Sequence, residues 1–210
     1  MGKITLLNCD CMTYMKTLDD NAFDLAIVDP PYGIGMAKER PRKDGRFAMN
    51  KPRDWDNAIP SQEYFNELER VSVNRVIWGG NYFPLPPTQC FIFWYKQNPV
   101  PNFSDGELAW TSFKRPAQCF NFKYYGSIQG ITSAEKKIHI SQKPIELYDW
   151  LLKNFAEKGQ SILDTHLGSG SSAIAAHYGG FDFVGCELDE DYFKAAQSRI
   201  DHETKQIAMF

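Results

Sequence analysis

The sequence contains no apolar run approaching the roughly 20 residues needed to cross a bilayer, and no long apolar signal region follows Met1. These two absences argue against a membrane protein and predict a cytoplasmic one. Cysteine is scarce as well: the five residues are odd in number and scattered, which indicates reduced thiols. Because Cys9 and Cys11 have no second pair at zinc-ligand spacing, we expect no metal site.

The chain also lacks the positive net charge that is common among nucleic-acid-binding proteins, since its formal net charge is −3. Basic residues nevertheless gather between Met36 and Arg53, where seven of them stand against Glu39 and Asp44. The seven are Lys38, Arg40, Arg42, Lys43, Arg46, Lys51 and Arg53. A local basic segment of this kind suits contact with phosphates, although a solvated loop is the ordinary alternative. With glycines, prolines and no hydrophobic period, residues 33–58 are expected to form a mobile loop that orders on substrate.

A length of 210 residues with 43% hydrophobic content predicts a single domain with a normal core. Short apolar runs bounded by breakers predict strands, and apolar residues at helical spacing predict helices between them. The predicted strands are 4–7, 24–28, 75–78, 91–95, 107–113, 117–122, 161–164 and 181–186. The predicted helices are 10–18, from 61 to about 71, 144–155, 173–178 and 189–200. We expect 107–113 and 117–122 to pair as an antiparallel hairpin.

One predicted strand, Asp24–Val28, ends at the segment Asp29-Pro30-Pro31-Tyr32. Prolines fix φ and donate no backbone N–H, so the carbonyls here are free and held still. The segment therefore offers a carboxylate, an exposed carbonyl and a flat ring on a rigid platform, which suits an aromatic base that carries an amino group. An ordinary proline turn after a core strand is the alternative.

A second strand, Ser161–Asp164, leads into a glycine-rich turn and then a helix, which is how nucleotide-binding units begin. Glycines let a ligand approach the backbone closely. The third glycine of the dinucleotide fingerprint is missing after Gly168-Ser169-Gly170, so a nucleoside ligand without phosphates is favoured. Glu187 ends the next strand roughly 20 residues after Asp164, a spacing that suits ribose hydroxyls.

With these motifs in this order, the chain resembles the S-adenosylmethionine-dependent amino-methyltransferases of DNA, in the permuted beta class. In that family the Asp-Pro-Pro-Tyr segment precedes the cofactor loop, as it does here. The segment 139–144, His-Ile-Ser-Gln-Lys-Pro, resembles the family motif before the cofactor strand, and Asp10 resembles the acid that contacts the adenine of the cofactor. Where the family usually has Asp-Pro-Phe, this chain has Asp164-Thr165-His166, and His166 still offers a flat ring.

The resemblance implies roles for particular residues. Asp29 and the Pro30 carbonyl would accept hydrogen bonds from the target amine, while Tyr32, following Pro31, would stack on a flipped-out base. The implied cofactor-binding residues are Asp10, Lys143, Asp164, His166, Gly168, Ser169, Gly170 and Glu187. For Lys143 there are two alternatives, contact with the methionine part of the cofactor or a local structural role. Asp10 and Glu187 have the ordinary alternative of a helix cap or an ion pair.

The fold implied is α/β and three-layered: a mainly parallel, Rossmann-like sheet with one reversed edge strand, helices on both faces and a circularly permuted motif order. Residues 117–138 occupy the position of a target-recognition segment. The implied function is methylation of adenine N6 in DNA. Alternatives are cytosine N4, ribosomal RNA or a protein glutamine as target, or an inactive module that only binds nucleic acid. Asp29 favours adenine because the cytosine enzymes often carry serine there. A monomer and a homodimer both remain open.

Overall fold

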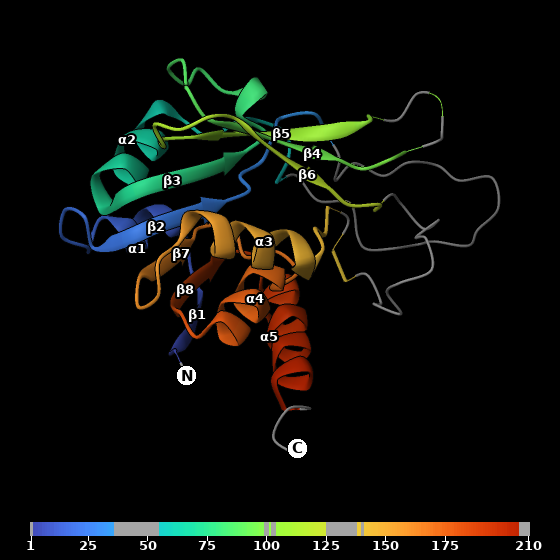
Figure 1. Ribbon diagram of the computed structural model, residues 1–210. Coiled ribbons are helices and arrows are strands. Elements are labelled where there is room, and N and C mark those ends of the chain that lie inside the picture. Colours follow the sequence, from blue (N-terminus) through green and yellow to red (C-terminus); the bar gives the residue numbers. More distant parts are fainter. Residues whose placement is uncertain are drawn as a thin grey trace.

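Eight strands form one sheet in the order β1-β8-β7-β2-β3-β5-β4-β6 in this computed structural model (Figure 1). The structure describes residues 2–35, 55–98, 101, 104–124, 138–139 and 141–205 of the 210-residue chain. The strands are β1 (Ile4–Asn8), β2 (Phe23–Val28), β3 (Ser72–Trp78), β4 (Phe91–Tyr95), β5 (Gly106–Thr111), β6 (Gln118–Asn121), β7 (Ser161–Asp164) and β8 (Asp182–Glu187).

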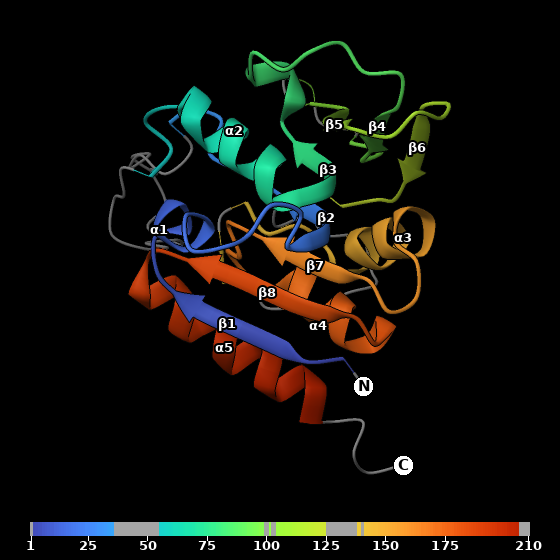
Figure 2. The same ribbon diagram turned by 90° about the vertical axis from the view of Figure 1, so that its left-hand side faces the viewer.

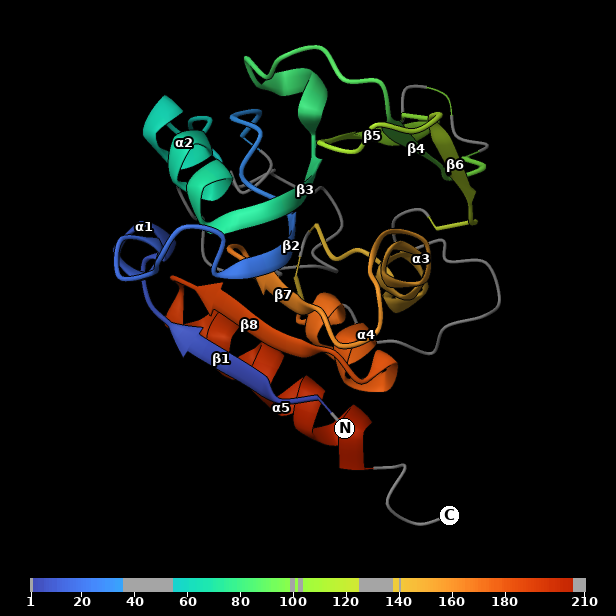
Figure 3. The same ribbon diagram turned by 60° about the vertical axis from the view of Figure 1, so that its left-hand side comes forward.

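Two layers of helices enclose the sheet, as Figures 2 and 3 show. The helices α1 (Cys11–Met15) and α2 (Gln62–Val71) cover one face, and α3 (Ile145–Phe155), α4 (Ser171–Gly179) and α5 (Glu190–Lys205) cover the other. A short 3-10 helix, η1 (Gly80–Tyr82), follows β3. This arrangement confirms the predicted three-layer α/β fold.

The sheet core explains why strands could be recognised from continuous apolar runs. β2 lies in the middle of the sheet, where Leu25 and Ile27 pack with the cluster under α3 and α4, while Ala26 and Val28 pack with the cluster under α2. A strand covered on both faces needs apolar side chains on both, so its sequence does not alternate. Within the part of the chain that the structure describes, no helix is both long and apolar enough to cross a membrane.

The predicted reversed strand exists, but not at the edge. β5 runs antiparallel to both β3 and β4, whereas β6 runs parallel to β4 and occupies the edge. The predicted hairpin of 107–113 with 117–122 is therefore wrong, because β4 lies between β5 and β6. The connection 112–117 is long enough to pass one strand, since two strand spacings are only about 10 Å. Packing of Phe120 on Trp150 of α3 holds β6 on the far side.

Parallel pairing brings the carboxyl ends of five strands, β1, β8, β7, β2 and β3, to the same end of the sheet. Asn8 pairs with Glu187, Asp164 with Gly185, and Val28 with Ile77. Because β5 is reversed, its first residues lie at this same end of the sheet. Ligands bind outside the carboxyl ends of the strands in open α/β sheets.

Candidate active site and cofactor cavity

A cavity of about 620 Å³ lies at the carboxyl ends of the parallel strands. Its walls come from segments far apart in the sequence: the ends of β1, β2, β7 and β8, the turn before α3, and the start of α5. Among the residues predicted for the site, those that line the cavity are Asp10, Asp29, Pro31, Lys143, His166, Gly168, Ser169 and Glu187.

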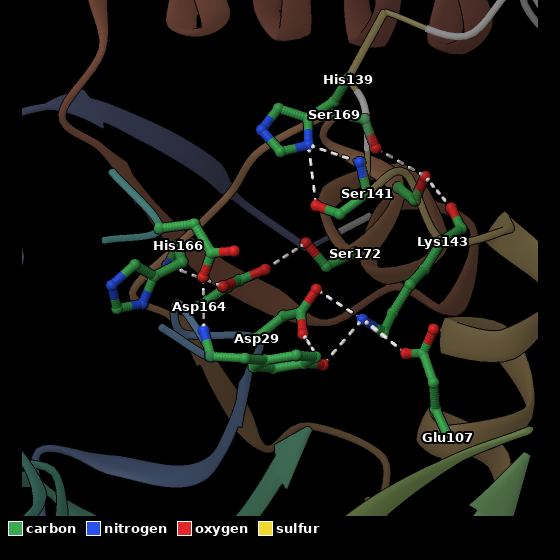
Figure 4. Close-up of polar contacts among 12 residues, drawn as sticks. Asp29, Glu107, His139, Ser141, Lys143, Asp164, His166, Ser169 and Ser172 are labelled. Carbon is green, nitrogen blue, oxygen red and sulfur yellow. Dashed lines mark hydrogen bonds and ion pairs between the residues drawn. The ribbon is translucent and has the colours of Figure 1, made fainter. Parts of the chain in front are cut away.

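Asp29 follows β2 directly and presents its carboxylate at the cavity. Its two oxygens accept from different donors: Tyr32 Oη donates to Oδ1 at 2.6 Å and Lys143 Nζ donates to Oδ2 at 2.6 Å (Figure 4). The buried Pro30 fixes the backbone that follows. The carboxylate is therefore held in one orientation, and each oxygen keeps a second lone pair for a further donor.

Lys143 forms ion pairs with two carboxylates, those of Asp29 and Glu107. Its Nζ lies 2.6 Å from Asp29 Oδ2 and 3.1 Å from Glu107 Oε2, and the side chain is only 4% exposed. Burial alone would lower the pKa of Lys143, but the two carboxylates outweigh it, so the pKa lies above its usual value. Glu107 also pairs with Lys96 of the segment after β4. Its burial is outweighed by the two lysines, which hold the pKa of Glu107 at about 2.

Tyr32 is fixed from several sides. Its ring stacks on Tyr82, with centroids 4.9 Å apart and planes at 12°. Gly79 makes room for it, because a Cβ at that position would lie 2.2 Å from Tyr32 Cε1, and the φ of +71° also favours glycine. One face of the ring is thus occupied by Tyr82, so the predicted stacking on a base would need the other face, and it stays a prediction.

Asp56 joins the two ends of the long segment between β2 and α2. Its Oδ1 accepts from the backbone N–H groups of Tyr32 at 2.8 Å and Gly33 at 2.9 Å, and its backbone oxygen accepts from Gly35 at 3.0 Å. The side chain is nearly inaccessible to solvent. The chain therefore leaves and returns at one point, directly beside Tyr32.

Glu187 supports the glycine turn from the end of β8. Its Oε2 accepts from the N–H of Gly168 at 2.9 Å, and its Oε1 accepts from the N–H of Asp189 at 3.0 Å. Gly168 has a φ of +54°, and a Cβ added there would be at ordinary van der Waals distance, 3.8 Å, from His139. Gly168 also lines the cavity, so the turn borders it directly. Gly170 does not line it, because Gly170 precedes α4 and packs on Ile200.

Asp164 lies buried behind the cavity. It accepts from Ser172 Oγ at 2.6 Å and from the N–H of His166 at 3.0 Å, and burial raises its pKa to about 7. Burial also lowers the pKa of His166 to about 4, which keeps this ring neutral at physiological pH. The ring packs edge-on to Tyr64 and lines the cavity, and its predicted role as a flat surface beside the cofactor stays a prediction.

Asp10 takes the alternative role that its sequence position left open. Its carboxylate caps α1 by accepting from the N–H of Met12 and from both the N–H and the hydroxyl of Thr13. Burial alone would raise the pKa of Asp10, but these hydrogen bonds outweigh it and the pKa is lowered. Asp10 still lines the cavity, so its predicted contact with an adenine stays a prediction.

Several residues at the site were not singled out from the sequence. Glu107, Asp56, Tyr82 and Trp55 carry no local motif, and their partners lie far away in the chain. Gln142 belonged to a motif that was recognised, without a role of its own. The seven basic residues predicted to contact phosphates, from Lys38 to Arg53, lie outside the described residues, as do 125–137 of the predicted recognition segment. The described residues contain no cluster of metal-ligating side chains.

This geometry is that of a Rossmann-like α/β protein with a nucleoside-sized cavity at the carboxyl edge of its sheet. The family model described as DNA methylase, of the N6/N4 methyltransferase type, matches residues 87–198, which is more than half of the chain. The protein belongs to this DNA methylase family.

Individual relatives agree with this membership. The chain is 27% identical over 203 residues to the putative methylase YubD of Escherichia coli K12, with 91% of this chain and 87% of YubD covered. It is 24% identical over 243 residues to the type II methyltransferase M.HinfI of Haemophilus influenzae, with 93% of this chain and 68% of M.HinfI covered.

Among solved structures, the M1.HpyAVI–SAM complex shares the fold with a TM-score of 0.60 at 21% identity, over 94% of this chain and 100% of that one. The cytosine-N4-specific PvuII DNA methyltransferase has a TM-score of 0.56 at 12% identity, over 99% and 93% of the two chains.

Proposed function

We propose that this DNA methyltransferase of the N6/N4 family transfers a methyl group from S-adenosyl-L-methionine to N6 of an adenine in DNA. The observation that carries the proposal is the placement of Asp29. Its carboxylate lines the cavity, held by Tyr32 and Lys143, with lone pairs left for an amine. The aspartate favours adenine, because the cytosine enzymes that the motif resembles often carry serine at this position.

The cavity fits S-adenosyl-L-methionine in size and chemistry. A volume of about 620 Å³ lies within the range for small-molecule sites. Gln142 lines the cavity, and its buried Nε2 has no hydrogen-bond partner among the residues described, so it is an N–H donor in need of an acceptor. We propose that Gly168, Ser169 and Glu187 hold the methionine and ribose parts. When bound, the cofactor supplies an electrophilic methyl group on a sulfonium.

The protein would contribute by orienting the target amine. The exocyclic nitrogen of adenine is a poor nucleophile because its lone pair is delocalised into the ring. Asp29 and the Pro30 carbonyl would accept its two hydrogens and favour tetrahedral geometry at nitrogen. The second face of the Tyr32 ring would stack on the base. Catalysis then depends on positioning and fixed charges.

Such an amine is out of reach inside a duplex, so the base must rotate out of the stack, at a cost of a few kcal/mol. Tyr32 stacking and the base-edge hydrogen bonds would offset that cost. We propose that the basic residues between Lys38 and Arg53 hold the phosphates, because the insertion that carries them is joined to Tyr32 through Asp56.

The target base can be identified directly. Purified protein is incubated with unmethylated DNA and S-adenosyl-L-methionine, and the digested nucleosides are analysed by mass spectrometry. N6-methyladenine supports the proposal, and methylome sequencing of cells that express the protein then gives the recognition sequence. N4-methylcytosine would establish the alternative target instead. Cofactor binding without methylation of any nucleic acid would favour an inactive binding module.

Glu187 gives a test of the cofactor site. We expect Glu187→Ala to weaken S-adenosyl-L-methionine binding by roughly 1–3 kcal/mol, because the variant cannot make the charged hydrogen bonds at the glycine turn. Calorimetric titration measures the effect. Glu190→Ala, an exposed acid at the start of α5, is the matched control and should bind as the wild type does. Unchanged affinity in a folded Glu187→Ala protein would remove Glu187 from the site.

The basic segment gives a test of the DNA interface. Neutralising Arg40, Arg42, Lys43 and Arg46 together should weaken binding to all DNA sequences alike. The slope of log K against log salt should flatten by up to about 0.9 for each phosphate that the variant no longer neutralises, while cofactor affinity stays unchanged. Neutralising four exposed lysines elsewhere, Lys153, Lys158, Lys194 and Lys205, is the control. A quadruple variant that keeps the wild-type slope would place the phosphate-binding surface elsewhere.

A further inference from the structure

Glu107 reaches Lys143 from the reversed strand β5. It is the second residue of β5, the reversed strand, so it lies at the edge where the parallel strands end. In the register with β4 it stands opposite Trp94. A parallel strand in this place would bring its last residues to the end of the sheet where Lys143 lies, but the reversal brings an early one. Figure 4 shows the Glu107 carboxylate pointing at the Lys143 ammonium from the side opposite Asp29.

The charges in this region alternate along a chain of contacts. Lys96 pairs with Glu107, Glu107 Oε2 lies 3.1 Å from Lys143 Nζ, and Lys143 Nζ lies 2.6 Å from Asp29 Oδ2. Lys143 Nζ is also 3.3 Å from Tyr32 Oη. The contact between Glu107 Oε2 and Lys143 Nζ is an ion pair without a hydrogen bond, so Glu107 attracts the ammonium by its charge, while the hydrogen bonds to Asp29 and Tyr32 orient it. Without Glu107, a flexible four-carbon stem would leave Nζ free to rotate away from Asp29.

We propose that Glu107 is a positioning residue for methyl transfer, which holds the Lys143 ammonium so that Lys143 and Tyr32 together fix the Asp29 carboxylate. This inference rests on the proposed function, since it assigns Asp29 to the target amine. Glu107 does not line the cavity, so it acts through Lys143 and has no contact of its own with the cofactor site. The low pKa of Glu107 agrees with this role, because the residue stays ionised throughout the working pH range.

The first test separates turnover from binding. In Glu107→Gln we expect kcat to fall about 10–100-fold, because small misplacements of a reacting group have effects of this size. KM for DNA and affinity for S-adenosyl-L-methionine should stay within about twofold of wild type. Glu67→Gln, which removes one of the two acidic partners of Arg70 on α2, is the control and should keep wild-type kcat. Wild-type kcat in Glu107→Gln, or a raised KM with unchanged kcat, would overturn the proposal.

Glu107→Gln leaves Lys96 without its carboxylate partner, and this loss is expected to lower the stability of the fold. The double variant Lys96→Gln/Glu107→Gln removes both charges together and is expected to show the same fall in kcat. Wild-type turnover in the double variant would equally refute a positioning role.

The second test needs no methyl transfer. With lysine labelled at Cε, the Lys143 resonance is assigned by its disappearance in Lys143→Arg and titrated by NMR. The groups that act on Nζ are Asp29 and Tyr32 after β2 and Glu107 on β5. Lys96 after β4 pairs with Glu107, and Tyr148 on α3 and Asp164 on β7 interact with Asp29. Removing the Glu107 carboxylate is expected to lower the pKa of Lys143 in Glu107→Gln, because an anion next to the ammonium is lost.

The two tests distinguish the possible failures. An unchanged titration in the folded variant refutes the contact between Glu107 and Lys143 whatever the enzyme does. A wild-type protein that methylates no nucleic acid but shows the expected titration would refute the proposed function and, with it, the role of Glu107 in turnover.

Discussion

Asp29→Ala is expected to abolish methyl transfer while S-adenosyl-L-methionine affinity stays nearly intact. Asp29 is the residue proposed to meet the target amine, and losing an acceptor that acts on the reacting nitrogen should cost about 10³-fold or more in rate. The fold should survive, because Lys143 keeps Glu107 as its partner. Cofactor binding should survive because the glycine turn and Glu187 are untouched.

Single-turnover transfer of a labelled methyl group to DNA measures the loss, and calorimetry measures cofactor binding. Asp19→Ala removes an exposed aspartate from the turn before β2 and serves as the control, with wild-type values for both. Near-normal turnover by a folded Asp29→Ala protein would disprove the catalytic assignment.

Lys143→Met is expected to cause the largest loss of stability, roughly 3–5 kcal/mol in the free energy of unfolding. Lys143 is almost fully buried, and its removal leaves Asp29 and Glu107 as neighbouring carboxylates without their shared cation. The pKa of Lys143 is raised in the folded state, so its stabilisation is complete below the ordinary lysine value and is lost only at higher pH.

Urea unfolding at pH 7–8 therefore measures the full effect. Lys153→Met is the matched control, because Lys153 also pairs with an aspartate, Asp149, but is 71% exposed. Exposed pairs contribute about 0–1 kcal/mol. Equal losses in the two variants would mean that the buried network does not stabilise the fold.

Much of the fold could be predicted because its signals are local. Strands such as β2 and β7 are short apolar runs that end at breakers, and the two helical layers follow from apolar spacing in α2 and α3. The position of β5 was not predictable in this way. Which strand β4 pairs with depends on contacts such as Phe120 on Trp150, which no pattern within β4, β5 or β6 encodes.

The residues of the candidate site likewise fall into those with a local sequence signal and those without one. Asp29 and Tyr32 belong to one segment whose residue types already indicate their chemistry, and Gly168 belongs to a recognisable turn. Glu107 looks like any strand residue until β5 brings it to Lys143, which is far away in sequence. Asp10 shows the converse: its hydrogen bonds to Met12 and Thr13 are local, and Asp is a favoured cap, so the capping alternative was visible from the sequence.

The hydrogen bonds of Asp56 make the sheet scaffold independent of the length of the segment inserted between β2 and α2. Gly35 and Asp56 are joined by a hydrogen bond, so the scaffold meets the same two chain ends whatever lies between them. Each doubling of loop length costs only about 0.6 kcal/mol. The length and sequence of the inserted segment can therefore change while the residues that hold Asp29 and Tyr32 stay unchanged.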